Sequence, residues 1–141
     1  MFDRIYKSNS RFVWVRISGS LNDATLQQHV LDYNGECTGR SGLLELADCR
    51  ELNDVSGLSV LSCTQSAALE MGTQRVVGGR LAVLVSAELH FGLARAYAAI
   101  AGNHREEAQV FYDVGEALRW LGTDESLEDL EQFMQTALRV R

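Results

Sequence analysis

Apolar residues along the chain gather in short runs that are typical of β-strands. Residues 12–17 are rich in β-branched and aromatic side chains, and residues 2–7 have weaker strand character. A polar turn at residues 8–10 separates these two runs, so we expect a hairpin. Three more strands are expected at residues 43–47, 81–85 and 108–112. The first is the nearly continuous apolar run of a central strand buried on both faces, and the second is the clearest strand of the chain.

Between and after these runs, apolar residues recur at helical spacing. Residues 24–33 place Leu26, Val30 and Tyr33 on one face. Asn22 and Asp23 precede them as N-cap candidates. A second helix is expected from Ser56 to Gly72, with its buried stripe at Leu61, Thr64, Ala68 and Met71. Further helices are expected at residues 88–101, 115–121 and about 126–140.

The order of these elements predicts a single α/β domain over residues 1–141. Its core spans about residues 2–121, and an extra C-terminal helix follows at about 126–140. Strands that alternate with helices imply a mixed sheet of four or five strands, with helices mostly on one face. We expect the last helix to cover this sheet; a dimer arm is the alternative.

Composition and charge narrow the function classes. The chain is 46% hydrophobic and 23% charged, which is typical of a globular protein, and its net charge of -6 with no Lys/Arg block argues against a nucleic-acid or anionic-membrane partner. No stretch is apolar and long enough to span a bilayer, and no signal peptide is recognisable. Three cysteines without CxxC spacing, Cys37, Cys49 and Cys63, suggest reduced thiols and a cytoplasmic location, and we expect Cys49 and Cys63 to be buried.

Catalytic and metal-binding motifs are missing from the sequence. It contains no G-x-S-x-G elbow, no P-loop and no G-x-G-x-x-G. His29, His90 and His104 have no acidic or cysteine partner at ligand spacing, so we expect no metal and no cofactor. We therefore do not expect an enzyme.

The most informative stretch is residues 53–61, Asn-Asp-Val-Ser-Gly-Leu-Ser-Val-Leu, at a strand-to-helix connection. Ser56 is expected at or near the N-terminus of the helix. A serine hydroxyl there can cap the helix, and it can also carry a phosphate at low electrostatic cost. Asp54 could equally be the cap, and the residues alone leave these alternatives open.

Residues 54–61 resemble the Asp-Ser-Ser-Gly-Leu-Gly-type motif of STAS domains, which include the bacterial anti-sigma-factor antagonists. Residues 17–24 and 110–118 are similar to that family's first strand-to-helix turn and to its last strand and helix, so the resemblance covers roughly residues 2–121. Residues 81–102 and 110–121 also resemble the little-characterised SpoIIAA-like branch.

The resemblance implies a regulatory protein-binding module in which Ser56 is the phosphorylation site and Asp54 its polar neighbour. The unphosphorylated form would bind a kinase or an anti-sigma factor. The partner-binding residues would be Asp54, Val55, Ser56, Gly57 and Ser59. Val55 replaces a small residue of the family motif, and it either obstructs a kinase or packs inward.

Two alternatives remain. The chain could instead carry a small hydrophobic ligand or lipid in a pocket between sheet and helices, lined by residues such as Trp14, Phe91 and Tyr97. The small residues Gly92, Ala96 and Ala99 either pack on the sheet or form a homodimer contact.

Overall fold

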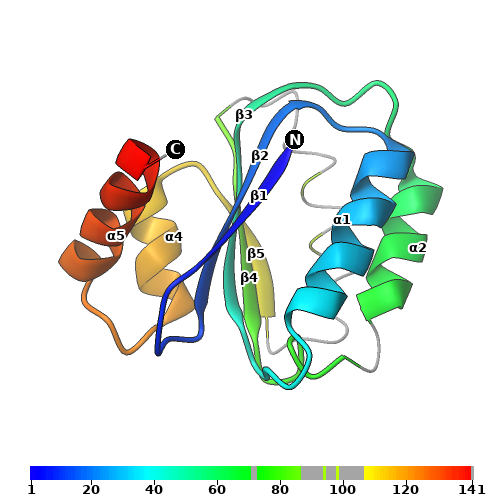
Figure 1. The fold of residues 1–141 in the computed structure, drawn as a ribbon. Helices are drawn as coiled ribbons and strands as arrows, with labels where there is room; N and C mark the ends of the chain where they lie inside the picture. Colours follow the sequence, from blue (N-terminus) through cyan, green and yellow to red (C-terminus); the bar gives the residue numbers. More distant parts are fainter. Residues whose placement is uncertain (71–72, 87–93, 95–97, 99–106, 141) are drawn as a thin grey trace.

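The computed structural model describes residues 1–70, 73–86, 94, 98 and 107–140. Five strands form one sheet whose spatial order follows the chain: β1 (Phe2–Tyr6), β2 (Phe12–Ser20), β3 (Leu44–Asp54), β4 (Arg80–Leu84) and β5 (Glu107–Phe111). β1 pairs with β2 as an antiparallel hairpin, and the other pairings are parallel (Figure 1). The expected hairpin and the α/β class with a mixed sheet are confirmed.

Four described helices cover both faces of the sheet: α1 (Asp23–Glu36), α2 (Val60–Glu70), α4 (Val114–Leu121) and α5 (Leu127–Val140). Figure 1 shows α1 and α2 on one face and α4 and α5 on the other. This differs from the expectation that the helices lie mostly on one face. The reason lies in β2, where Val13 and Val15 belong to one core cluster and Phe12 and Trp14 to another. Both faces of the sheet are therefore apolar, and helices must shield both from water.

The C-terminal helix covers its own sheet, as expected. Leu130 and Met134 of α5 are buried in the cluster that contains Trp14 and Leu46. The expected helix at 88–101, with Phe91, Tyr97 and the small residues Gly92, Ala96 and Ala99, lies outside the described residues.

Two helices differ from their predicted bounds. α1 continues through Asn34 and Gly35, and it starts with a capping box in which Asn22 and Thr25 exchange side-chain-to-backbone hydrogen bonds. α2 begins at Val60, four residues after Ser56. Because β3 extends to Asp54, the connection between β3 and α2 consists of residues 55–59.

The buried face of α2 is not the expected one. Leu61, Thr64 and Ala68 are exposed, and Met71 lies outside the described residues. The buried positions hold mostly small side chains: Ser62, Cys63, Ser66, Ala67 and, near the C-terminus, Glu70. The large apolar side chains of α2, Val60, Leu61 and Leu69, are exposed.

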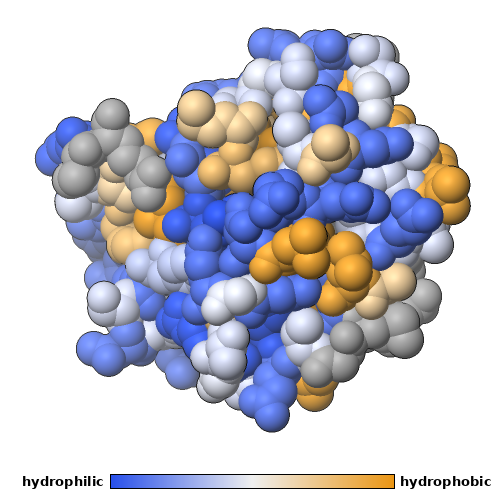
Figure 2. All heavy atoms as spheres, turned by 45° about the vertical axis from the view of Figure 1, so that its right-hand side comes forward, coloured by the Kyte–Doolittle hydropathy of each residue, from blue (hydrophilic) through white to orange (hydrophobic). Residues whose placement is uncertain are grey.

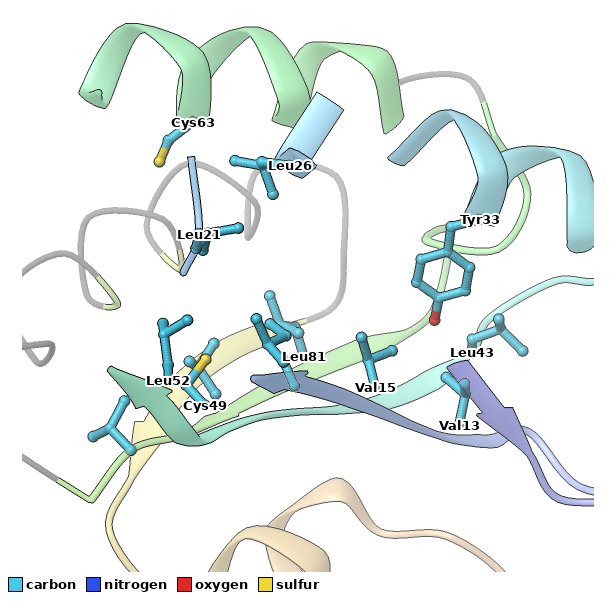
Figure 3. Close-up of a cluster of buried hydrophobic side chains, with 14 of the residues drawn as sticks. Val13, Val15, Leu21, Leu26, Tyr33, Leu43, Cys49, Leu52, Cys63 and Leu81 are labelled. Atoms are coloured by element: carbon cyan, nitrogen blue, oxygen red, sulfur yellow. The ribbon is translucent and has the colours of Figure 1, made fainter. Parts of the chain in front are cut away.

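The core between the sheet and the α1/α2 layer is apolar. Figure 3 shows Val13 and Val15 from β2, Cys49 and Leu52 from β3 and Leu81 from β4 facing Leu26 and Tyr33 of α1. No helix within the described ranges combines the length and hydropathy that a bilayer crossing requires.

Candidate functional site

The sequence motif forms an exposed turn at the carboxyl ends of the parallel strands, beside the start of α1. We call residues 54–58 the Ser56 turn. Asp54 ends β3, and its carbonyl accepts a 2.8 Å hydrogen bond from the Leu21 amide just before α1. The turn closes through a 3.0 Å bond from the Leu58 amide to the Val55 carbonyl. The motif is therefore held by main-chain bonds to a segment more than thirty residues earlier.

Ser59, not Ser56 or Asp54, caps α2. Its hydroxyl accepts a 3.0 Å hydrogen bond from the Ser62 amide, which is the N-cap geometry. The same hydroxyl donates to Asp23 Oδ2 at 2.9 Å, and the Ser59 amide donates to Asp23 Oδ1 at 2.7 Å. The expectation that Ser56 or Asp54 caps this helix is wrong. Asp23 selects Ser59 by accepting two of its hydrogen bonds.

Ser56 is exposed at the tip of the turn. Its backbone amide donates to Asp54 Oδ1 at 2.9 Å. This bond is the main reason that the pKa of Asp54 lies below its usual value, with further help from the Ser56 and Ser20 hydroxyls. Asp54 is fully exposed and is therefore a carboxylate at neutral pH.

Gly57 brings the turn against the N-cap of α1. Its carbonyl accepts a hydrogen bond from the Asp23 amide at 3.2 Å. A Cβ atom on residue 57 would lie 2.9 Å from the Cβ of Asn22, so a larger residue would push the two segments apart. Glycine is needed here for close approach.

Val55 and Leu58 point inward and pack against the α1/α2 core, which settles the two alternatives for Val55 in favour of packing. The outward surface of the motif continues into α2, where Val60 and Leu61 are 60% and 67% exposed. Figure 2 shows hydrophobic side chains exposed among hydrophilic ones on the side of the molecule that carries α1 and α2. An exposed serine beside exposed apolar side chains is suited to contact with another protein.

A cavity of about 80 Å³ lies between the sheet and the α1/α2 layer. As far as the structure describes them, its walls are apolar except at His29 and Glu45. The lining residues are Phe2, Ile17, Leu21, Leu26, His29, Glu45, Ala47, Cys49, Leu52, Val55, Leu58, Cys63, Val83, Val85 and Ala94. As expected, Cys49 and Cys63 are buried thiols, and so is Cys37.

The pocket residues expected from the sequence are not the ones that line this cavity. Trp14 lies on the opposite face of the sheet, where its Nε1 donates to Asp48 Oδ2 at 3.1 Å. The reason is the strand alternation that sends neighbouring Val13 and Val15 to the α1/α2 side. Phe91 and Tyr97 are outside the described residues.

His29, on the cavity wall, is held in a neutral state. Burial, together with the charges of Arg4 and Arg75, lowers its pKa to about 3. Its Nδ1 lies 3.0 Å from Arg4 Nη1, and because arginine can only donate, Nδ1 is the acceptor. Arg4 also binds both carboxylate oxygens of Glu36, at 2.9 and 2.7 Å. This is the arrangement of a structural network that ties β1 to α1.

Asp23 is the site residue whose role the sequence did not reveal. It was recognised only as a cap candidate for its own helix, and no local pattern links it to Ser59. Over the described part of the chain, no three His, Cys, Asp or Glu side chains gather in a way that could hold a metal ion.

Neither a protein-family model nor a curated protein sequence matches the chain. Among solved structures, it is similar to an uncharacterised protein of the DUF3478 family with a SpoIIAA-like fold from Shewanella loihica PV-4. The TM-score is 0.56 at 19% identity, over 86% of this chain and 92% of that chain. The chain thus has a SpoIIAA-like fold, and the fold implied by the STAS-like motifs is confirmed.

Proposed function

We propose that this protein is a cytosolic regulatory module that binds a protein partner in the manner of the anti-sigma-factor antagonists. Its contact surface comprises the Ser56 turn and the exposed first turn of α2. Phosphorylation of Ser56 is the switch that releases the partner, which would be a kinase or an anti-sigma factor.

The observation that carries this proposal is that the two serines of the motif differ: Ser59 has a structural role, and Ser56 is exposed. The Ser59 hydroxyl is engaged on both sides, by Asp23 and by the Ser62 amide. Ser56 is exposed, has no capping role and interacts through its hydroxyl with the exposed Asp54 carboxylate, so a kinase could modify it without loss of the helix start. The motif therefore offers one accessible serine and one structural serine.

Charge supports the same mechanism. A phosphate would add about two negative charges next to the Asp54 carboxylate. It would compete for the Ser56 amide that Asp54 now binds, and it would add charge to the surface that also exposes Val60 and Leu61. An apolar contact made by the unphosphorylated surface would be weakened without any change of fold.

The first test locates the phosphate. The purified protein is incubated with lysate of its source cell and ATP, and modified serines are mapped by mass spectrometry. We expect modification of Ser56 and none of Ser59. Modification confined to other residues, or none at all, would contradict the proposed switch.

The second test measures partner binding. Immobilised Ser56→Ala and Ser56→Asp proteins are compared for the proteins they retain, and Ser41→Asp serves as a matched control because Ser41 is exposed outside the motif. We expect a partner that is retained by the Ser56→Ala and Ser41→Asp proteins and lost from Ser56→Asp. Equal recovery on all three would mean that Ser56 is not a switch.

A second candidate function is transport of a small hydrophobic ligand, which the apolar cavity favours. Its volume of about 80 Å³ is well below the roughly 300–1,000 Å³ of pockets that hold drug-sized ligands. It therefore suits a molecule much smaller than a lipid. Native mass spectrometry of the purified protein tests this candidate directly, because a carrier would retain a bound mass.

A further inference from the structure

The Ser56 turn and the apolar cavity share a wall. Val55 and Leu58, which flank the exposed Ser56–Gly57 pair, both line the cavity. The sheet provides the opposite wall through Leu52 and Cys49, which Figure 3 shows pointing toward Leu21 and Cys63. The outer surface of the turn thus faces solvent while its inner surface faces the cavity.

We propose that this cavity is a regulatory site for a small, uncharged, apolar molecule, and that an occupant fixes the conformation of the Ser56 turn through Val55 and Leu58. The proposal does not depend on phosphorylation of Ser56 or on any protein partner. A bound small molecule would then regulate the conformation of the Ser56 turn independently of phosphorylation.

The chemistry of the walls defines the ligand. The described residues that line the cavity are apolar or cysteine apart from His29 and Glu45, which are almost fully buried. His29 is neutral, so it offers no charge to an anion. Mostly apolar walls of this kind favour apolar atoms or small hydrocarbons as occupants. The volume of about 80 Å³ limits the occupant to a molecule smaller than most metabolites.

The coupling follows from how the turn is held. On the outside, polar bonds fix it: Ser56 N–H to Asp54, Asp23 N–H to the Gly57 carbonyl, and Ser59 N–H to Asp23. On the inner side of the turn, Val55 and Leu58 border the cavity and therefore lack some of the van der Waals contacts that a filled core would provide. A ligand would supply those contacts. It would then favour the closed turn. Because coupling is reciprocal, a change that favours or opposes the closed turn would raise or lower the affinity for the ligand.

Xenon is a suitable probe because it is apolar and small. Amide hydrogen exchange of the full chain is followed by NMR with and without xenon pressure. We expect chemical-shift changes at cavity-lining residues and several-fold slower exchange of the Leu58 and Ser59 amides. Absence of xenon-dependent shifts at the lining residues, or binding that leaves these two amides unchanged, would overturn the proposal.

Variants separate binding from coupling. Val55→Ala enlarges the cavity but removes one contact to the turn, so xenon should still bind while the slowing of exchange is reduced at least twofold. Leu58→Ala is the second variant of the same kind. Leu69→Ala, on the exposed face of α2, is the matched control and should behave as the unmodified protein. An undiminished effect in both Val55→Ala and Leu58→Ala would contradict the coupling.

The last part of the test asks the reverse question, whether a change at the Ser56 turn alters the affinity of the cavity for xenon. Ser56→Asp should change the xenon dissociation constant at least twofold, whereas the distant Ser41→Asp should leave it unchanged. Equal affinities in the two variants would overturn the linkage between cavity and turn. Because none of these readouts involves a partner, a negative result here is distinct from a failure of the proposed protein-binding function.

Discussion

Asp23 and Ser59 join the starts of two helices through a pair of hydrogen bonds. Asp23 is the first residue of α1, and its two carboxylate oxygens accept the amide and the hydroxyl of Ser59 at 2.7 and 2.9 Å. Ser59 in turn caps α2. The Ser56 turn is therefore held at both ends, by the hydrogen bond from the Leu21 amide to the Asp54 carbonyl and by the Asp23–Ser59 pair.

Removing this pair should destabilise the protein. Ser59→Ala should lower the free energy of unfolding by about 1 kcal/mol because α2 loses its cap. Asp23→Ala should cost about 1–3 kcal/mol because a charged acceptor of two hydrogen bonds is lost. Ser56→Ala, at an exposed position without a capping bond, should stay within about 0.5 kcal/mol. Urea denaturation measures all three.

A double-mutant cycle checks that the two residues act together. The Asp23→Ala/Ser59→Ala protein should lose less stability than the two single losses added, because they share the same hydrogen bonds. A larger loss for Ser56→Ala than for Ser59→Ala would show that the cap is misassigned.

The close approach at Gly57 leads to a second prediction. Gly57→Ala should destabilise the protein by about 1–3 kcal/mol, since the new Cβ would meet Asn22 at 2.9 Å. Gly35→Ala is the control: it lies within α1 with no atom in reach of a Cβ, and should stabilise by up to about 1 kcal/mol. Thermal unfolding distinguishes the two. Equal shifts would mean that Gly57 is not in close contact with α1.

Buried His29 should make the protein sensitive to mild acid. In the folded state its pKa is lowered to about 3, below the ordinary value of 6.5. The unfolded chain therefore takes up a proton below pH 6.5 that the folded chain refuses. The contribution to stability is complete above that pH and is lost as pH falls toward 3, by up to about 1.4 kcal/mol per pH unit.

His29→Gln tests this, because glutamine can still accept the hydrogen bond from Arg4 but does not titrate. The free energy of unfolding is compared between about pH 7 and about pH 5 for both proteins, and the variant should show a flatter dependence. An unchanged slope would assign the acid sensitivity to other groups.

A buried ion pair closes the opposite end of the α1/α2 layer. Arg75 is 2% exposed, lies 3.9 Å from the ring centroid of Tyr33, and approaches Glu70 to 3.3 Å. Arg75→Met should cost about 3–5 kcal/mol, because it removes the buried cation 3.3 Å from Glu70 and the 3.0 Å hydrogen bond that Arg75 donates to Asn34. The double variant Arg75→Met/Glu70→Leu should recover most of this loss in chemical denaturation. A double variant as unstable as the single one would show that charge is not the cause.

The strands could be predicted because burial on both faces leaves a clear pattern, as in residues 81–85. The start of α2 could not, because Ser56 and Ser59 are both good N-caps by local criteria. Asp23, 36 residues away from Ser59, decides between them. Trp14 was misplaced for a similar reason: alternation shows that neighbouring residues face opposite sides, but only the assembled layers show which side holds the cavity.

The order of the strands bears on how the chain folds. Because each of the five described strands pairs with the next along the chain, pairing can proceed from the N-terminus during synthesis without waiting for a distant segment. The face that holds Trp14 and Leu46 is the exception, since α4 and α5, which cover it, come last. A nascent chain that ends before Val114 would expose this face, and we expect a chaperone that recognises apolar surface to bind it there.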